Sequence, residues 1–326
     1  MPRTDSSARR HTGRSRRLRV AAAFAVLVAL GGYMSVQYLS GGKGSQQCTV
    51  RSADGSSGEG RTYRLSPEQA ANAATISAVG TTRGMPERAV TIALATALQE
   101  SGLRNIEHGD RDSLGLFQQR PSQGWGTGKQ ILDPVYAAGK FYQHLAEVPG
   151  YSRLPLTVAA QRVQRSGFPQ AYAKHEPDAA LLAAVLTGRT PAALNCSPSR
   201  TTAGTGDASK VRAELIRSFG KGVLPAAKRA DGRTSTAGAT APGSLSVPVR
   251  PGGKSGEDGA SGDGGASVEG GAPRHGWELA HWAVAQSEAL GIGEVAYAGR
   301  VWDAGSGWRT ESEKSGTTAV RMRFVR

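Results

Sequence analysis

The chain reads ALQESGL at residues 97–103, and SLGLFQQ follows at residues 113–119. The first stretch closes a segment that opens at Pro86 and is apolar on more than one side, which is typical of a buried central helix. Gly102 supplies a C-cap signal for this helix. Glu100 is therefore a lone carboxyl in the last turn of a mostly buried helix, where apolar surroundings and the helix dipole raise a carboxyl pKa. Such a glutamate can donate a proton near neutral pH.

These stretches and a later segment form a pattern along the chain. Glu100-Ser101-Gly102 comes first, Ser113 with Gly115-Leu116-Phe117-Gln118 second, and Ala171-Tyr172-Ala173 third. In this order they resemble the lysozyme-like superfamily, above all its lytic transglycosylases and goose-type lysozymes. The resemblance covers roughly residues 64–190. It implies an enzyme that cuts the glycan strands of bacterial peptidoglycan.

The resemblance also implies a role for individual residues. Glu100 is then the general acid, and the Tyr172 hydroxyl reaches its carboxyl group. The substrate groove is implied to contain Ser101, Ser113, Gly115, Leu116, Phe117 and Gln118. The chain departs from the family pattern at Phe117, where Met is usual, and at Ala173, where Asn is usual. The second departure leaves the shell of contacts around Tyr172 incomplete.

A second catalytic carboxylate is an open question in the sequence. An inverting lysozyme would place one about 6.5–9.5 Å from the acid to activate water, and Asp110 and Asp112 lie in the loop where it could sit. The alternative for both is solvation and capping of turns. A transglycosylase needs no second carboxylate, because one glutamate serves as acid and then as base. Trp125, between two glycines, is either a sugar-stacking platform or a packing residue.

The N-terminal part of the chain has an asymmetric charge pattern. The net charge is +14, and seven arginines precede an uncharged run over residues 20–42. This pattern predicts a cytoplasmic basic tail over 1–19, a transmembrane anchor over 20–42 and a linker over 43–63, with the bulk of the chain outside the cell membrane, facing the wall. A cleaved signal peptide is the alternative. Because the basic tail acts as a topology signal, we expect no nucleic-acid partner.

The central part of the chain reads as helical. Residues 64–196 predict an all-α lysozyme-like domain, because no segment alternates convincingly as a strand. Ser66 and Gln69 form a capping-box pattern for its first helix, which we expect to stop at Gly80.

The C-terminal part has a different composition. A linker over 197–206 leads to a small α/β accessory module over 207–326, with two helices, about three strands and a disordered insertion over 250–273. This module holds four of the five tryptophans, which serve either glycan stacking or a small core.

Two cysteines, Cys48 and Cys196, bracket the helical domain. Outside the cytoplasm a sparse, even pair predicts a disulfide. The bond would close a loop of roughly 150 residues and contribute about 4–5 kcal/mol in the chain-entropy model. Two unrelated free thiols are the alternative. With two cysteines and scattered histidines we expect no metal site and no cofactor.

Taken together, these patterns predict a multidomain, single-pass membrane protein whose outer part cleaves peptidoglycan. Its expected partners are peptidoglycan glycan strands and the cytoplasmic membrane. The alternative, from a different class, is a non-catalytic cell-envelope protein of the lysozyme fold that binds peptidoglycan or scaffolds wall enzymes. Ala173 and the uncertain second carboxylate keep this alternative open.

Overall fold

Helix α2 (Pro67–Thr82) begins at the capping box that the sequence predicts. The Ser66 hydroxyl accepts a 3.2 Å hydrogen bond from the Gln69 backbone N–H, and Gln69 Oε1 accepts a 2.8 Å bond from the Ser66 backbone N–H. We expected the helix to stop at Gly80, but it continues to Thr82. The ring of Tyr142 packs against α2 at this glycine, where an added β-carbon would lie 2.6 Å from the ring. Gly80 therefore makes room for an aromatic side chain and does not end the helix.

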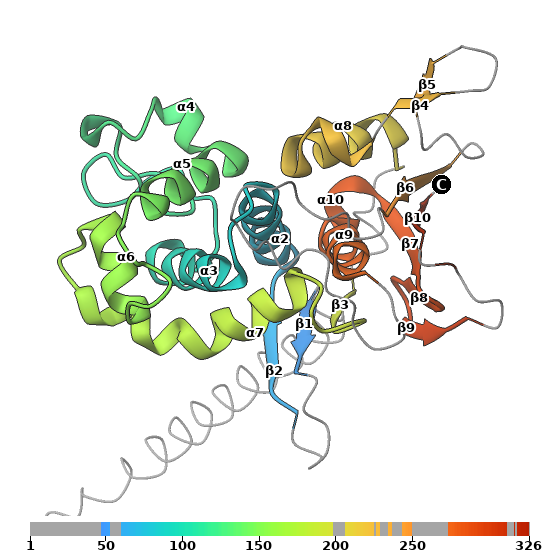
Figure 1. Cartoon of the computed structure of the whole chain (residues 1–326), viewed down its shortest axis with the longest axis horizontal. Coiled ribbons are helices and arrows are strands. Elements are labelled where there is room, and N and C mark those ends of the chain that lie inside the picture. The colour runs from blue at the N-terminus through green and yellow to red at the C-terminus, as the bar shows by residue number, and fades with distance from the viewer. Residues whose placement is uncertain are drawn as a thin grey trace, which may run out of the picture. The chain divides into compact units, whose positions relative to one another are not determined.

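The computed structural model describes residues 47–52, 60–197, 206–224, 226–228, 234–236, 243–249, 273–311, 316 and 318–325 (Figure 1). The helices that follow α2 are α3 (Glu87–Ser101), α4 (Gly128–Ile131), α5 (Pro134–Ala146), α6 (Leu156–Gln164) and α7 (Glu176–Leu186), and the short 3₁₀ helices are η1 (Pro121–Gln123), η2 (Pro169–His175) and η3 (Lys221–Val223). Residues 89–98 of α3 are all buried, which confirms the predicted central helix. Helix α3 packs against α7 and η2, and α2 packs against α5.

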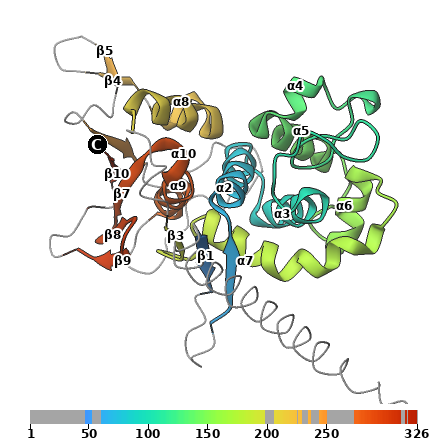
Figure 2. The same cartoon turned by 180° about the vertical axis from the view of Figure 1, so that it is seen from behind.

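A three-stranded antiparallel sheet accompanies these helices. Its strands are β1 (Gln47–Arg51), β2 (Thr62–Leu65) and β3 (Leu194–Ser197), in the order β2-β1-β3, and β1 contacts α7 (Figure 2). The prediction of an all-α domain over 64–196 is therefore wrong, and part of the expected linker over 43–63 forms strands. In β1 only Cys48 and Val50 point into the interior. Two apolar positions beside a Gly/Ser-rich stretch are too short a pattern to indicate a strand.

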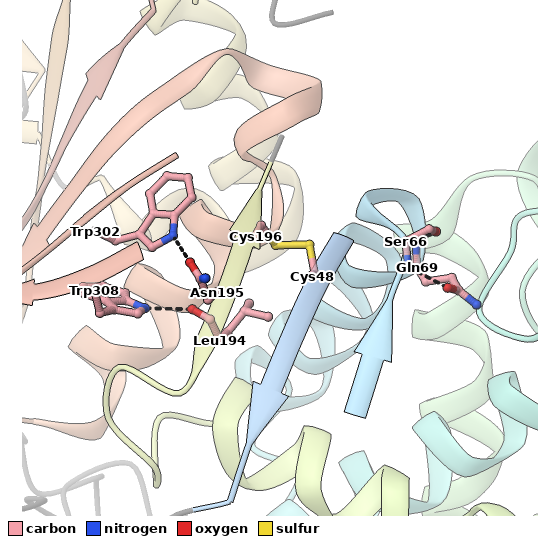
Figure 3. The surroundings of a disulfide bond; sticks show 8 residues. All are labelled: Cys48, Ser66, Gln69, Leu194, Asn195, Cys196, Trp302 and Trp308. Atoms are coloured by element: carbon pink, nitrogen blue, oxygen red, sulfur yellow. Dashed lines mark hydrogen bonds between the residues drawn. A yellow bond between two sulfur atoms is a disulfide. The ribbon is translucent and has the colours of Figure 1, made fainter. Parts of the chain in front are cut away.

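The cysteines form the predicted disulfide. Cys48 and Cys196 are direct partners in the pairing of β1 with β3, and their sulfur atoms are bonded across a separation of 148 residues. The bond joins the first described strand to the strand that ends the helical part (Figure 3).

The C-terminal part contains a second antiparallel sheet, of five strands in the order β6-β10-β7-β8-β9. Its elements are α8 (Ala208–Phe219), β6 (Ser244–Pro248), α9 (Arg274–Ala285), α10 (Ser287–Leu290), β7 (Ile292–Tyr297), β8 (Arg300–Asp303), β9 (Gly307–Thr310) and β10 (Ala319–Phe324), and β4 (Ala226–Lys228) pairs with β5 (Thr234–Thr236). The expectation of about three strands is too low. Ala298 and Gly299, with φ +50° and +75°, form a tight turn that separates β7 from β8. This turn lacks the Asn-Gly or Asp-Gly signature of such hairpins.

The C-terminal elements pack directly on the helical part. Helix α9 contacts α2, α7 and β3, and the described residues from Gln47 onward belong to one compact unit. The Trp302 indole N–H donates a 2.8 Å hydrogen bond to Asn195 Oδ1, and the Trp308 indole donates a 2.7 Å bond to the Leu194 backbone oxygen (Figure 3). His281 is fully buried between α7 and β3, with its Nδ1 2.8 Å from the Val185 backbone oxygen. Trp302 and Trp308 therefore hold the C-terminal part of the chain against the helical part.

The predicted membrane anchor requires a correction. Within the described ranges, no helix combines the length and apolar character needed to cross a bilayer. The transmembrane helix, the signal-anchor role and the single-pass membrane location are therefore not supported. The uninterrupted apolar part of the run over 20–42 is residues 20–30, which is shorter than the ~20 apolar residues that a spanning helix needs. Residues 1–46, 198–205 and 250–272, with the expected tail, anchor and disordered insertion, lie outside the described residues.

Candidate active site

Glu100 occupies the last turn of α3, and the chain turns sharply after it. Gly102 has φ +64°, the left-handed conformation that the C-cap signal predicts, and Leu103 follows with φ +62°. Ser101 ties this turn to the next part of the site, because its hydroxyl donates a 2.8 Å hydrogen bond to the Leu116 backbone oxygen. Ser101 thus fixes the helix end against the 113–119 stretch.

Tyr172, in η2, contacts Glu100 directly. Its side chain is fully buried, and its hydroxyl donates a 2.7 Å hydrogen bond to Glu100 Oε1. Burial raises the pKa of Glu100 above its ordinary value, and the hydrogen bonds from Tyr172 and Gln164 partly offset this rise. Burial and the neighbouring Glu100 raise the pKa of Tyr172 as well, so the phenol keeps its proton and remains a donor. This contact has the geometry that the resemblance implies for the pair.

Gln164, the last residue of α6, is a third polar group at this carboxyl. Its Nε2 donates a 2.6 Å hydrogen bond to the Phe117 backbone oxygen, and its amide also hydrogen-bonds Glu100. Ser166 hydrogen-bonds the Tyr172 hydroxyl. Sequence reasoning missed Gln164 and Ser166, because a polar residue at a helix end is usually solvated and only the fold brings α6 to Glu100.

The 113–119 stretch forms a closed turn. Leu114 and Gln119 exchange two backbone hydrogen bonds, of 2.9 and 3.0 Å. Gly115 has φ +73°, and an added β-carbon would lie 2.7 Å from the Ile131 backbone oxygen. Only glycine therefore fits at this point of the turn.

The apolar side chains of this turn point into the core. Leu116 and Phe117 are fully buried, and Phe117 stacks on Phe141 with ring centroids 4.7 Å apart. The turn meets the site through its backbone, at the Phe117 oxygen that accepts from Gln164.

Both candidate second carboxylates are already engaged by the loop. Arg120 donates a 3.0 Å hydrogen bond from Nε to the Ser113 hydroxyl and forms a 2.9 Å ion pair with Asp110. Asp112 accepts a 2.9 Å bond from the Ser122 backbone N–H, which holds the pKa of Asp112 below its ordinary value. Asp112 thus caps the loop, and Asp110 is balanced by a guanidinium group.

These groups surround an open cleft of about 890 Å³. Of the residues predicted from the sequence, the cleft is lined by Glu100, Asp110, Ser113, Gln118 and Trp125, whereas Ser101, Asp112, Gly115, Leu116, Phe117 and Tyr172 are not part of its wall. The Trp125 ring lies edge-on to His144, with centroids 4.5 Å apart. Phe168, which we did not predict, also lines the cleft and is 78% exposed, an unusual state for a large apolar side chain.

Comparison with protein families gives a match elsewhere in the chain. A family described as "VldE, C-terminal domain" matches residues 245–322, which run from β6 into β10. The match includes neither Glu100 nor any other residue that lines the cleft. No curated protein matches the chain. The family match therefore does not extend to the cleft.

Proposed function

We propose that this protein cleaves the glycan strands of peptidoglycan, with Glu100 as general acid and then as base. The observation that carries the proposal is the 2.7 Å hydrogen bond from Tyr172 to Glu100 beside a cleft of about 890 Å³. Burial raises the pKa of Glu100 and so favours its protonated form, and breaking a glycosidic bond requires a proton on the leaving oxygen. The lysozyme-like sequence pattern supports the same substrate class.

The surroundings of Glu100 suit both halves of such a reaction. The protonated carboxyl gives its proton to the glycosidic oxygen as the bond to the sugar carbon breaks. The carboxylate that results is then stabilised by the donors of Tyr172 and Gln164, both of which lower the pKa of Glu100. The two side chains therefore orient the acid and also stabilise the charge that forms on it.

The second half of the reaction can follow two routes. Water can attack the sugar carbon and leave a reducing end, or the hydroxyl of the same sugar can attack and close an anhydro ring. In either route Glu100 takes up the proton of the attacking group. Asp110 is paired with Arg120 and Asp112 caps the loop, which supports the route that needs a single carboxylate. Transglycosylase chemistry is thus the form of the proposal that we favour.

The rest of the cleft is suited to sugar. Gln118 offers an amide, and Trp125 and Phe168 offer aromatic faces or edges on which sugar rings can pack. A mixture of a few polar groups and partly exposed aromatic rings is typical of small-molecule and glycan sites.

Fragment release from purified peptidoglycan tests the proposal. The full chain is compared with Glu100→Gln and with Glu107→Gln, a matched control at an exposed carboxyl outside the cleft. We expect soluble fragments from the wild type and the control, and none from Glu100→Gln. If folded wild-type protein pellets with peptidoglycan and releases nothing, the protein belongs instead to the class of non-catalytic wall-binding proteins.

A further inference from the structure

The wall of the cleft contains four arginines, at positions 111, 120, 162 and 165. Arg120 is held by Ser113 and Asp110. The other three are exposed, and no described carboxylate lies within ion-pair distance of Arg111, Arg162 or Arg165. We name these three residues the arginine rim.

The carboxylates of the same wall are all occupied by other groups. Asp110 pairs with Arg120 at 2.9 Å, Glu147 lies 3.5 Å from His144 Nδ1, and Glu100 is bonded by Tyr172. The three guanidinium groups of the arginine rim therefore form no ion pair with the described carboxylates of the cleft wall. An anionic group of a bound molecule would meet guanidinium donors with no internal competitor.

Two members of the arginine rim adopt an uncommon backbone conformation. Arg111 has φ +58° and Arg165 has φ +51°, and Gln118 of the same wall has φ +47°. Non-glycine residues in the left-handed region are infrequent and gather at binding and catalytic sites. Arg165 also ends α6 directly after Gln164, which bonds Glu100. Two members of the rim, Arg162 and Arg165, thus flank Gln164 in the chain.

We propose that Arg111, Arg162 and Arg165 bind the carboxylates of the peptides that branch from peptidoglycan strands, so that the substrate is peptide-bearing and not bare glycan. This inference rests on the proposed function. In a peptide-bearing strand the lactyl carboxyl groups are tied up as amides, so the sugars are neutral and gain little from cations, whereas a peptide carboxylate matches the planar donor fork of arginine. The stem peptides hang from the lactyl groups of alternate sugars and bring carboxylates to the edge of any cleft that holds the strand.

The test measures binding in the Glu100→Gln background, so that it does not depend on cleavage. Soluble, un-cross-linked glycan strands are titrated in three forms. The first carries its peptides. The second has lost its peptides to an amidase, and the lactyl carboxylates that this exposes have been coupled to methylamine so that the strand is neutral. The third carries its peptides but has been treated with hydrofluoric acid to remove phosphodiester-linked wall polymers. The arginine rim is changed to glutamine at all three positions. The control carries Arg51→Gln, Arg64→Gln and Arg153→Gln, which remove the same charge at exposed positions outside the cleft.

The expected pattern separates charge at the rim from charge in general. An exposed charge pair changes affinity by about twofold to threefold, so loss of all three raises the Kd for peptide-bearing strands about tenfold. The Kd for peptide-free strands stays within about twofold of the parent, and the control triple behaves like the parent throughout. The salt dependence of binding to peptide-bearing strands also weakens in the rim variant.

Several results would overturn this inference. Equal losses on peptide-bearing and peptide-free strands, or no loss on either, exclude recognition of peptides by the rim. Disappearance of the effect after hydrofluoric acid treatment assigns the anion to a phosphodiester polymer. If the protein does not bind peptide-bearing strands at all, recognition of peptides by the rim is likewise excluded. If Glu100→Gln cleaves peptidoglycan as the wild type does, only the proposed function fails, because the binding titrations do not depend on cleavage.

Discussion

The Tyr172 hydroxyl lies 2.7 Å from Oε1 of Glu100, although 72 residues separate the two in the chain. The contact forms where η2 packs against the end of α3. It supplies a hydrogen-bond donor to a carboxyl whose pKa burial has raised. The chemistry of Glu100 and the fold that creates this contact can be tested separately.

Tyr172→Phe keeps the buried ring and removes only the hydroxyl. Because the lost hydrogen bond is made to a group that becomes charged, we expect kcat/KM for peptidoglycan to fall roughly 10- to 100-fold. This bond lowers the pKa of Glu100, so its loss raises that pKa further. The acid then stays protonated to higher pH, and the basic limb of the pH–rate profile moves upward. Tyr63→Phe, on β2, serves as the control. A basic limb that does not move, or moves downward, would show that Tyr172 does not act on the acid.

Gln164→Leu tests the second donor at Glu100. The change removes the hydrogen bonds to the carboxyl and to the Phe117 oxygen, while leucine fills a similar volume. We expect kcat to fall about tenfold with KM little changed, since the amide positions the acid. The basic limb of the pH profile should again move upward. Gln143→Leu, at an exposed position of α5, is the matched control. A rise in KM with kcat unchanged would assign Gln164 to substrate binding only.

The predictable parts of the fold are those whose signals are local. The capping box of Ser66 and Gln69 and the C-cap at Gly102 depend on a few neighbouring residues, and both occur in the structure. The role of Gly80 has no local signal, because it depends on Tyr142, a residue far along the chain. Strand β1 was missed because pairing with β2 and β3, and not its own short pattern, makes it a strand.

His281 gives the packing of α9 a pH dependence. Burial lowers the pKa of His281 to about 4, from an ordinary value near 6.5. As the pH falls below 6.5 the unfolded chain takes up a proton that the folded chain does not accept until about pH 4, so the free energy of unfolding decreases across this window. We expect the loss to reach about 3 kcal/mol.

Denaturant unfolding at pH 7.5 and pH 4.5 measures this loss. His281→Gln should be less stable than the wild type at pH 7.5, because the imidazole bonds Val185 and Ala193, and it should lose less stability on acidification. His108→Asn, at an exposed position, should retain the wild-type pH response. Equal pH responses of the wild type and His281→Gln would contradict the buried neutral imidazole.

The disulfide should stabilise the whole compact unit. Cys48 and Cys196 close a loop across 148 residues, and β3 also carries the acceptors for Trp302 and Trp308. We expect reduction to lower the free energy of unfolding by about 4–5 kcal/mol in the chain-entropy model. Thermal unfolding followed by circular dichroism, with and without dithiothreitol, measures the change. An unchanged Tm after thiol titration has confirmed reduction would show that the bond is not needed for stability.

The candidate site was predictable only where short motifs carry it. Glu100, Tyr172, Ser113 and Gln118 stand in the segments that carry the lysozyme-like resemblance. The structure brings Tyr172 to Glu100 and puts Ser113 and Gln118 in the cleft wall. Ser101 and Phe117 were expected in the groove, but the Ser101 hydroxyl bonds the Leu116 backbone oxygen and the Phe117 ring packs in the core.

The remaining cleft residues have no local signature. Gln164, Phe168, Arg162 and Arg165 reach the cleft only because α6 and the loop after it fold against α3, whereas Arg111 comes from the loop that follows α3. A single sequence does not show which polar residues of a helix end will face a distant carboxyl. Such residues can be identified only when the tertiary contacts are known.

End-group analysis tests the central claim most directly. Purified peptidoglycan is digested in ¹⁸O-labelled water by the full chain and by Glu100→Gln, and the products are analysed by mass spectrometry. We predict new glycan ends from the wild type only, as anhydro-sugar ends without the label, and reducing ends that carry ¹⁸O would indicate hydrolysis by the same acid. New ends in equal yield from Glu100→Gln, or none from folded wild-type protein, would contradict the assignment of Glu100 as the acid that cleaves the strand.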